Sequence, residues 1–187
     1  MVLMTIFRCE NVPSADNQQE RPQGINPWYI SGFVDGEGTF HVSFARRTDL
    51  PKKWAIIPEF HVSQDFARSS VLEEIKTSFD CGQIKQNHRG KSNDSTYVFV
   101  VRNRQDLINK IIPFFDRYPM RSSKQKDFLV FAQIVALMEN GYHRSEKGFR
   151  EITWKAFQMN GGGKYRKRKM AEILEESSET ICQNVQD

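Results

Sequence analysis

The first regular pattern along the chain is a short helical one that follows Asn26 and Pro27. Asparagine is a favourable N-cap, and proline suits the first helical position because its missing N–H would be unpaired there. The apolar residues that follow repeat at the spacing of one helix face: Ile30, Phe33 and Val34. We therefore predict a helix that ends near Gly38, with Gly32 and Gly36 four residues apart on a different face.

Strands and helices alternate over the rest of the sequence. Mixed aromatic, β-branched and polar residues predict strands over about 39–47, 54–64, 83–89 and 95–101. Apolar residues at helical spacing predict helices over about 70–79, 103–112, 123–140 and 145–159. Pro113 and Pro119 are expected to break the chain. This order indicates an α+β domain in which helices cover one face of a four-stranded, mixed or antiparallel sheet.

Three regions differ in composition. Residues 1–24 have no sustained period and are rich in Asn, Gln, Pro and Ser, so we expect a loose lead-in. Residues 25–160 carry the periodic pattern and are long enough to bury a core. Residues 161–187 begin with three glycines, which we interpret as a hinge, and continue as a basic and then acidic tail.

The charge balance leans weakly towards a polyanionic partner. Lys and Arg number 27 against 23 Asp and Glu, with a net charge of +4 and an isoelectric point near 9.0. No apolar stretch approaches the ~18 residues that a membrane helix needs. Cysteines stand scattered at positions 9, 81 and 182, which suits a reducing compartment. We therefore expect an intracellular protein without membrane contact.

Two features of the first helix need an explanation beyond its own stability. Interior glycines destabilise a helix by roughly 1 kcal/mol each relative to alanine, so Gly32 and Gly36 suggest that another backbone approaches closely. That backbone could belong to a second helix or to the protein's own sheet. Glu37 ends the helix, where the helix dipole is already negative. A bound divalent cation would explain this glutamate, and so would an ordinary solvated turn.

The segment Ile30–Gly38 resembles the LAGLIDADG motif of homing endonucleases, with matching residues at Gly32, Asp35, Gly36, Glu37 and Gly38. The element order over residues 25–140 is similar to the αββαββα core of that family. The resemblance implies an enzyme that uses Mg²⁺ to hydrolyse both strands of a long DNA target, with Mn²⁺ or Ca²⁺ able to replace Mg²⁺ for binding. It also implies an intron- or intein-associated protein of a bacterial cytoplasm, chloroplast or mitochondrion.

The motif occurs once in the sequence, and family members with one motif are homodimers. Metal-assisted phosphodiester hydrolysis commonly uses ions about 4 Å apart, which one Glu37 cannot hold and two copies could. The resemblance assigns Glu37 and the adjacent Gly36 to metal binding, although Asp is commonest at this place in the motif. We therefore expect a two-fold symmetric dimer and a near-palindromic target. The expected interface residues are Tyr29, Gly32, Phe33 and Gly36.

Three further residues match catalytic positions of the family. Gln64 stands where the family's second strand ends, and Arg68 follows four residues later. Lys124 closes a stretch, residues 118–124, that is similar to the one bringing a lysine to the phosphate. Without the resemblance, these residues would be interpreted as a surface glutamine, a solvated arginine and a lysine at a helix N-terminus.

The uncovered face of the sheet is expected to contact DNA. A nine-residue strand such as 39–47 spans roughly 30 Å, close to the ~34 Å of one DNA turn. Every second residue of a strand should face the groove of the DNA, and we allow for a break in this alternation near Gln64. The expected contacts are Thr39, His41, Ser43, Ala45, Arg46, Arg47, Ala55, Ile57, Glu59, His61, Lys85, Asn87, Arg89, Thr96 and Val98. Basic tail residues are expected on the phosphate backbone: Lys164, Arg166, Lys167 and Arg168.

Two other functions are compatible with this fold: an RNA-binding intron maturase and a catalytically silent DNA-binding protein. The presence of Glu37, Gln64 and Lys124 favours cleavage but does not exclude a second activity. An intron-splicing assay would separate the first alternative from a nuclease. The expected partners are double-stranded DNA and a second copy of the chain. We expect no small-molecule substrate. The glycines at 161–163 do not form a phosphate-binding loop, because no strand precedes them and the Gly-Lys-Ser or Gly-Lys-Thr ending is absent.

Overall fold

The computed structural model describes residues 24–87, 95–162, 166 and 168–175. The first half of the chain contains α1 (Pro27–Glu37), β1 (Gly38–Arg46), β2 (Trp54–Asp65), the 3-10 helix η1 (Phe66–Arg68), α2 (Ser70–Phe79), β3 (Gln83–Gln86) and β4 (Thr96–Val101). The second half contains α3 (Arg104–Asp106), the π-helix η2 (Leu107–Ile111), α4 (Ile112–Arg117), α5 (Lys124–Glu139), η3 (Tyr142–Arg144) and α6 (Glu146–Gly162). The predicted α+β class is confirmed.

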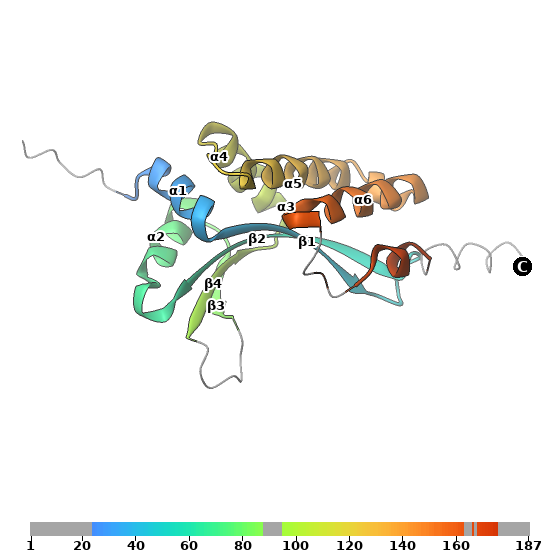
Figure 1. The fold of residues 1–187 in the computed structure, drawn as a ribbon, viewed down its shortest axis with the longest axis horizontal. Coiled ribbons are helices and arrows are strands. Elements are labelled where there is room, and N and C mark those ends of the chain that lie inside the picture. Colours follow the sequence, from blue (N-terminus) through green and yellow to red (C-terminus); the bar gives the residue numbers. More distant parts are fainter. Residues whose placement is uncertain (1–23, 88–94, 163–165, 167, 176–187) are drawn as a thin grey trace, which may run out of the picture.

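The four strands form one antiparallel sheet in the order β1-β2-β4-β3. Gly38 lies opposite Val62 at one end of the β1–β2 pair, and Arg46 lies opposite Trp54 at the other. Figure 1 shows α4, α5 and α6 on one side of this sheet, with α1 and α2 at one end. Among the described residues, no helix covers the opposite side of the sheet, as the order of helices and strands predicts (Figure 1).

Phenylalanines fill the space between the sheet and the helices. The fully buried ones are Phe40, Phe60, Phe99, Phe115, Phe128, Phe131 and Phe149. Phe40 of β1 has its ring centroid 5.2 Å from that of Phe60 and 5.2 Å from that of Phe128. Burial of each such ring contributes about 1.5–3 kcal/mol. Since side chains alternate along a strand, this core fixes which residues face the uncovered side.

Two expected boundaries differ from the observed ones. Pro113 does not break the chain: it lies in the first turn of α4, where a proline is tolerated, directly after the π-helix η2. The third strand ends at Gln86 and not at residue 89. Asn87 therefore lies just beyond the strand, and Arg89 falls outside the described residues.

Part of the expected tail, residues 168–175, contacts the domain. Residues 170–175 are helical, and Ile173 is fully buried in a small cluster with Trp54 and Phe149. The segment packs because Ile173 covers apolar side chains of β2 and α6 that would otherwise be exposed to water.

Candidate functional site

Helix α1 is attached to the domain along one side. The Asn26 side chain accepts a hydrogen bond from the backbone N–H of Trp28 at 2.8 Å, which is the predicted N-cap. Ile30, Ser31 and Val34 are buried. The Ser31 hydroxyl donates to the carbonyl of Tyr118 at 2.8 Å. The helix is therefore held in a fixed orientation relative to the segment that precedes α5.

The end of α1 requires a glycine at position 38. Its N–H donates to the carbonyl of Val34, and a Cβ at this position would lie 2.5 Å from Val34 Cγ1. No other residue fits without a shift in the chain. Glu37, directly before it, is exposed. The glutamate therefore stands at the point where the helix ends and β1 begins.

Asp35 holds the segment before α5 against the helix. Its carboxylate accepts hydrogen bonds from the backbone N–H groups of Arg121 and Ser122, both at 3.0 Å, and from the Ser122 hydroxyl. Burial alone would raise the pKa of Asp35, but these hydrogen bonds outweigh it and lower the pKa below its ordinary value. The sequence places Asp35 within the motif but gave no sign of this partner, which lies 86 residues away.

Lys124 reaches the carboxyl end of α1 from the start of α5. Its ammonium group donates to the carbonyl of Val34 at 2.9 Å and to that of Gly36 at 3.3 Å. Burial lowers the pKa of Lys124, while the charges of Asp35 and Glu37 oppose that shift. The structure thus brings together two of the residues expected at the site, Lys124 and Glu37.

The opposite side of α1 has no neighbour within the described residues at its two glycines. A Cβ added at Gly32 or at Gly36 would have no atom within 4 Å. Tyr29 on the same helix is 53% exposed. The alternative that these glycines pack against the protein's own sheet is therefore wrong for the part of the chain that the structure describes.

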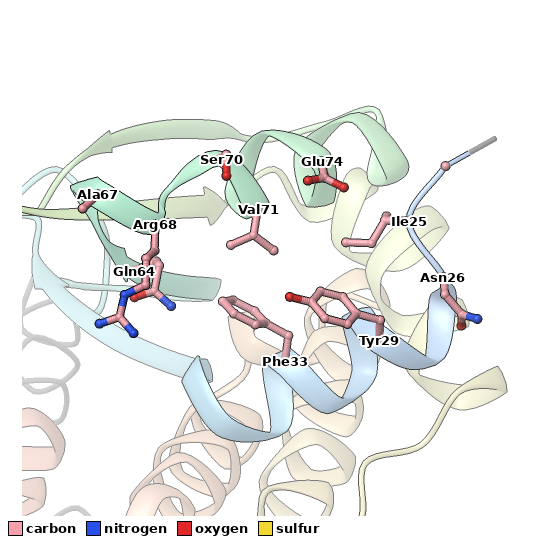
Figure 2. Close-up of a pocket in the computed structure, with 11 residues that line it drawn as sticks. Ile25, Asn26, Tyr29, Phe33, Gln64, Ala67, Arg68, Ser70, Val71 and Glu74 are labelled. Carbon is pink, nitrogen blue, oxygen red and sulfur yellow. The ribbon is translucent and has the colours of Figure 1, made fainter. Parts of the chain in front are cut away.

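A groove of about 900 Å³ runs along this side of α1. Tyr29 and Phe33 line it from the helix, and Gln64 and Arg68 line it from the end of β2 and from η1. Figure 2 shows Gln64 and Arg68 side by side, across the groove from the Phe33 ring. These two expected catalytic residues therefore share a groove with two of the four expected interface residues, Tyr29 and Phe33.

The register break expected near Gln64 is absent. Pairing is continuous from Gly38–Val62 to Arg46–Trp54, and β2 pairs with β4 without interruption from Phe60 to Asp65. Gln64 therefore has the parity of Phe60 and Val62, and it lies on the other face from Glu59 and His61. Its side chain faces the groove beside α1 instead of the uncovered face of the sheet.

Most of the residues expected to read DNA have the parity of the uncovered face. Pairs across β1 and β2 on this face are Thr39–His61, His41–Glu59, Ser43–Ile57 and Ala45–Ala55. Lys85 of β3 pairs with Val98 of β4. Thr96, at the start of β4, pairs with Asp65. The pairing thus places these residues on one face of the sheet, the face that no described helix covers.

Some of these residues have little surface to offer a ligand. Val98 is 3% exposed and Glu59 is 5% exposed, so neither side chain presents more than an edge. Arg46 has the parity of Phe44 and does not belong to the uncovered face. Arg47 lies beyond β1 and forms a paired hydrogen bond with Asp49, at 2.8 Å to each carboxylate oxygen.

Two basic residues of the last segment, Arg166 and Arg168, contact other parts of the chain. Arg166 donates to the carbonyls of Val42 and Ala156, both at 2.6 Å, and its guanidinium lies 4.7 Å from the Phe157 ring centroid. Arg168 pairs with Glu172 and lies 5.5 Å from the Trp54 ring centroid. The Arg166 side chain is thus bound by the domain, whereas the Arg168 side chain remains 49% exposed. Lys164 and Lys167 fall outside the described residues.

The residues at the end of α1 fit a hard divalent cation in part. Glu37 supplies an exposed carboxylate, and the Gly36 carbonyl is a neighbouring oxygen. Within the described segments, no group of three His, Cys, Asp or Glu side chains converges into a complete metal site.

In those segments there is also no helix long and apolar enough to cross a membrane.

Comparison with known proteins identifies relatives of the chain. The sequence pattern of the family described as LAGLIDADG endonuclease matches residues 30–135. A probable intron-encoded endonuclease of Neurospora crassa is 32% identical over 160 residues, covering 84% of this chain and 33% of the relative. The chain therefore spans about a third of the length of that relative.

Solved structures agree with this assignment. The homing endonuclease I-TnaI is 32% identical, with a TM-score of 0.73 over 82% of this chain and 99% of that one. The LAGLIDADG homing endonuclease I-LtrWI, solved bound to its target DNA, is 34% identical, with a TM-score of 0.68 over 73% of this chain and 45% of that one. Because the family pattern covers more than half of the sequence and the fold is the same, the chain belongs to the LAGLIDADG endonuclease family.

Proposed function

We propose that this chain is one half of a metal-dependent DNA endonuclease, completed by a second copy that packs against α1. The observation that carries the proposal is the open glycine side of α1, which ends at an exposed Glu37. A helix with this surface can bring a second helix, and with it a second carboxylate, close to the first. The activity follows from the pair of acids and not from either chain alone.

The proposed interface consists of Tyr29, Gly32, Phe33 and Gly36. Glycines permit close approach of two helix backbones, while Tyr29 and Phe33 line a groove that a partner can fill. A two-fold axis through this contact makes the assembly a symmetric homodimer. The proposed target is accordingly near-palindromic, on the order of 20 base pairs long.

Mg²⁺ is the proposed cofactor, with Mn²⁺ or Ca²⁺ able to replace it for binding. Glu37 and the Gly36 carbonyl would hold it, since Mg²⁺ prefers carboxylate, carbonyl and water oxygens. Bound there, the metal would stabilise the charge that develops on the oxygens of the scissile phosphate. Lys124 donates to the Gly36 carbonyl and thereby fixes the position of that oxygen.

Three side chains of this chain support the reaction in the proposal. Lys124 keeps a positive charge beside Glu37, where it attracts the phosphate and stabilises its developing negative charge. Gln64 and Arg68, which share the groove beside α1, orient water and neutralise phosphate charge at its periphery. Their donors are amide and guanidinium groups, which suit phosphate oxygens.

DNA is proposed to lie against the uncovered face of the sheet. Of the expected contacts, those with the right parity and an accessible side chain are Thr39, His41, Ser43, Ala45, Ala55, Ile57, His61, Lys85 and Thr96. Asn87 and Arg47 lie at the ends of strands on the same sheet. The solved relative I-LtrWI is bound to its target DNA, which supports DNA over RNA as the partner of this surface. An intron origin is proposed because the Neurospora relative is named as intron-encoded.

The experiment that tests the proposal is the substitution Glu37→Gln. Duplexes are first selected from a random library for cleavage by the wild-type chain with Mg²⁺, and cleavage and binding are then measured on one selected duplex. We expect Glu37→Gln to lose more than about 100-fold in cleavage and to bind the duplex as before. This loss exceeds the effect of mutating a residue that only hydrogen-bonds to a metal ligand.

The matched control is Glu73→Gln on α2, an exposed glutamate that pairs only with Lys76 on its own helix among the described residues. It should cut at the wild-type rate. Cleavage that survives in Glu37→Gln, or equal losses of cleavage and binding, would contradict the proposed metal role.

A further inference from the structure

Arg102 lies on the uncovered face of the sheet, directly beyond the end of β4. Val101 pairs with Phe60, so the next residue of the chain reaches the position opposite Glu59. The Nε atom of Arg102 is 2.5 Å from Glu59 Oε1. Across β1 and β2, Glu59 itself lies opposite His41. The three residues therefore form one row across the face proposed to meet DNA.

Glu59 is the anchor of this row. Its side chain is 7% exposed, and its second oxygen, Oε2, lies 2.8 Å from Nε2 of His61. A buried carboxylate without such partners would be strongly destabilising. Burial alone would raise the pKa of Glu59, but His61 and Arg102 outweigh it and lower the pKa, so the group is ionised at neutral pH. Both oxygens are thus committed to holding neighbouring side chains.

The consequence for Arg102 is a fixed guanidinium with an accessible edge. The side chain is 51% exposed while its Nε is held by Glu59. Arginine carries five N–H donors in a planar fork, and only one of them belongs to Nε. A guanidinium fixed in this way has less freedom to lose when it donates two parallel hydrogen bonds to a ligand.

We propose that Arg102 reads a guanine in the major groove of the target, and that Glu59, held by His61, positions it. Guanine presents two acceptors, N7 and O6, at the spacing of the arginine fork, and this is the commonest specific contact to a base. The inference rests on the proposed DNA-binding function of the sheet. It gives Glu59 a positioning role, which explains why a nearly buried acid stands on a surface meant for a polyanion.

The test compares base preference at every position of the site among four variants of the full chain. Arg102→Ala should lower discrimination for guanine at one base-pair position by about 10- to 100-fold, the range of one bidentate contact. Arg102→Lys, which keeps the charge without the fork, should lose discrimination at the same position while retaining most of the affinity. Glu59→Gln should relax that same position to a smaller extent.

The matched control is Arg104→Ala, two residues further on, where the guanidinium pairs with Glu139 of α5 on the helical side. Its base preference should equal that of the wild type. Thermal unfolding of each variant, followed by circular dichroism, identifies any that fail to fold, and Arg102→Lys tests the inference even if Glu59→Gln is unstable.

Two results would overturn the inference. A uniform loss of affinity at all sequences with a shallower salt dependence would make Arg102 a phosphate contact, and an unchanged preference in Arg102→Lys would remove the role of the fork. In both cases the wild-type chain still cuts its selected duplex, so the proposed function stands. A wild-type chain that binds no duplex defeats the proposed function instead.

Discussion

Helix α1 has two sides that differ in what the chain itself supplies to them. One side buries Ile30, Ser31 and Val34, and the first of these is wholly removed from solvent. The other side presents Tyr29 and two glycines, and the glycines have open space where a Cβ would be. An eleven-residue helix is marginal in isolation, so its stability comes from the first side. On the second side, the Tyr29 ring stacks on Phe33 of the same helix.

The cost of the glycines makes this difference informative. Two glycines in the interior of a helix destabilise it by roughly 1 kcal/mol each relative to alanine. No close approach within the described residues requires them, in contrast to Gly38, where a Cβ would collide with Val34. The contrast between these positions is the physical reason to expect a second helix on the open side.

The largest expected effect on stability comes from a substitution on the buried side of α1, compared with one on its open side. Ile30→Ala should lower the free energy of unfolding by about 2–5 kcal/mol, because it opens a cavity in the core. Tyr29→Ala should lower the free energy of unfolding of the monomer by only about 1 kcal/mol, because it loses the stacking of its ring on Phe33, but it should also weaken assembly. Urea unfolding at low protein concentration measures the free energy of unfolding of the monomer for both variants. Similar losses for the two variants would show that both sides are supported by the chain itself.

Next in size is the substitution Lys124→Met, on the side where α5 meets the end of α1. We expect cleavage to fall by about 100-fold, typical for a charged group that acts on the transition state, with binding reduced much less. Lys126→Met, an exposed lysine on the same helix, is the control and should cut normally. Equal losses of cleavage and binding would point to a structural role for Lys124 through the carbonyls that it contacts.

Gly32→Leu tests the open side directly. A Cβ at position 32 meets no atom within 4 Å beyond its own stretch of helix among the described residues, so the monomer should fold normally, while overpacking at a helix contact should weaken dimerisation by about 1–3 kcal/mol. Lys126→Leu adds an exposed leucine elsewhere and should leave dimerisation unchanged. An unaltered dissociation constant for Gly32→Leu, from a sedimentation concentration series, would place the interface on another surface.

The smallest effect concerns the carboxylate that ties α1 to the segment before α5. Asp35→Asn should cost about 1 kcal/mol at neutral pH. Because folding lowers the pKa of Asp35 below 3.8, its contribution is present above that value and is lost as the pH falls through the lower, folded value. The stability difference between wild type and Asp35→Asn should therefore be constant at about pH 5–7 and shrink below about pH 4.

Urea titrations across this pH range measure that difference. Asp116→Asn on α4, an exposed carboxylate, is the control and should change stability by less than about 0.5 kcal/mol. A difference for Asp35→Asn that stayed constant down to about pH 2 would show that its ionisation does not hold the segment.

Local patterns in the sequence predicted what local physics decides. The N-cap at Asn26, the helix end at Gly38 and the alternation along β1 depend on residues a few positions apart, and all three are found. Contacts over long separations were not visible in the same way. Asp35 meets its partners 86 and 87 residues away, and Ile173 packs from within a charged segment that suggested a solvated tail.

Gln64 shows a different limit of sequence reasoning. A register break was allowed for so that it could share a face with His61, but β2 is continuous through Asp65. Gln64 lines the groove beside α1. It lies on the same face of β2 as the core residues, but at the end of the strand, where the core no longer covers that face. At such a strand end, the side chains on one face pass from the core to a groove, and the alternation of residues along the strand does not show where this happens.

In the proposed assembly, two copies of α1 meet at their glycines. Sedimentation velocity of the full chain with a selected duplex, in Ca²⁺ to limit cleavage, measures how many chains the complex contains. We expect two chains per duplex, and we expect the Gly32→Leu chain not to form this species at the same concentration. A complex of one chain with one duplex, still cut on both strands when Mg²⁺ is added, would contradict the proposed assembly.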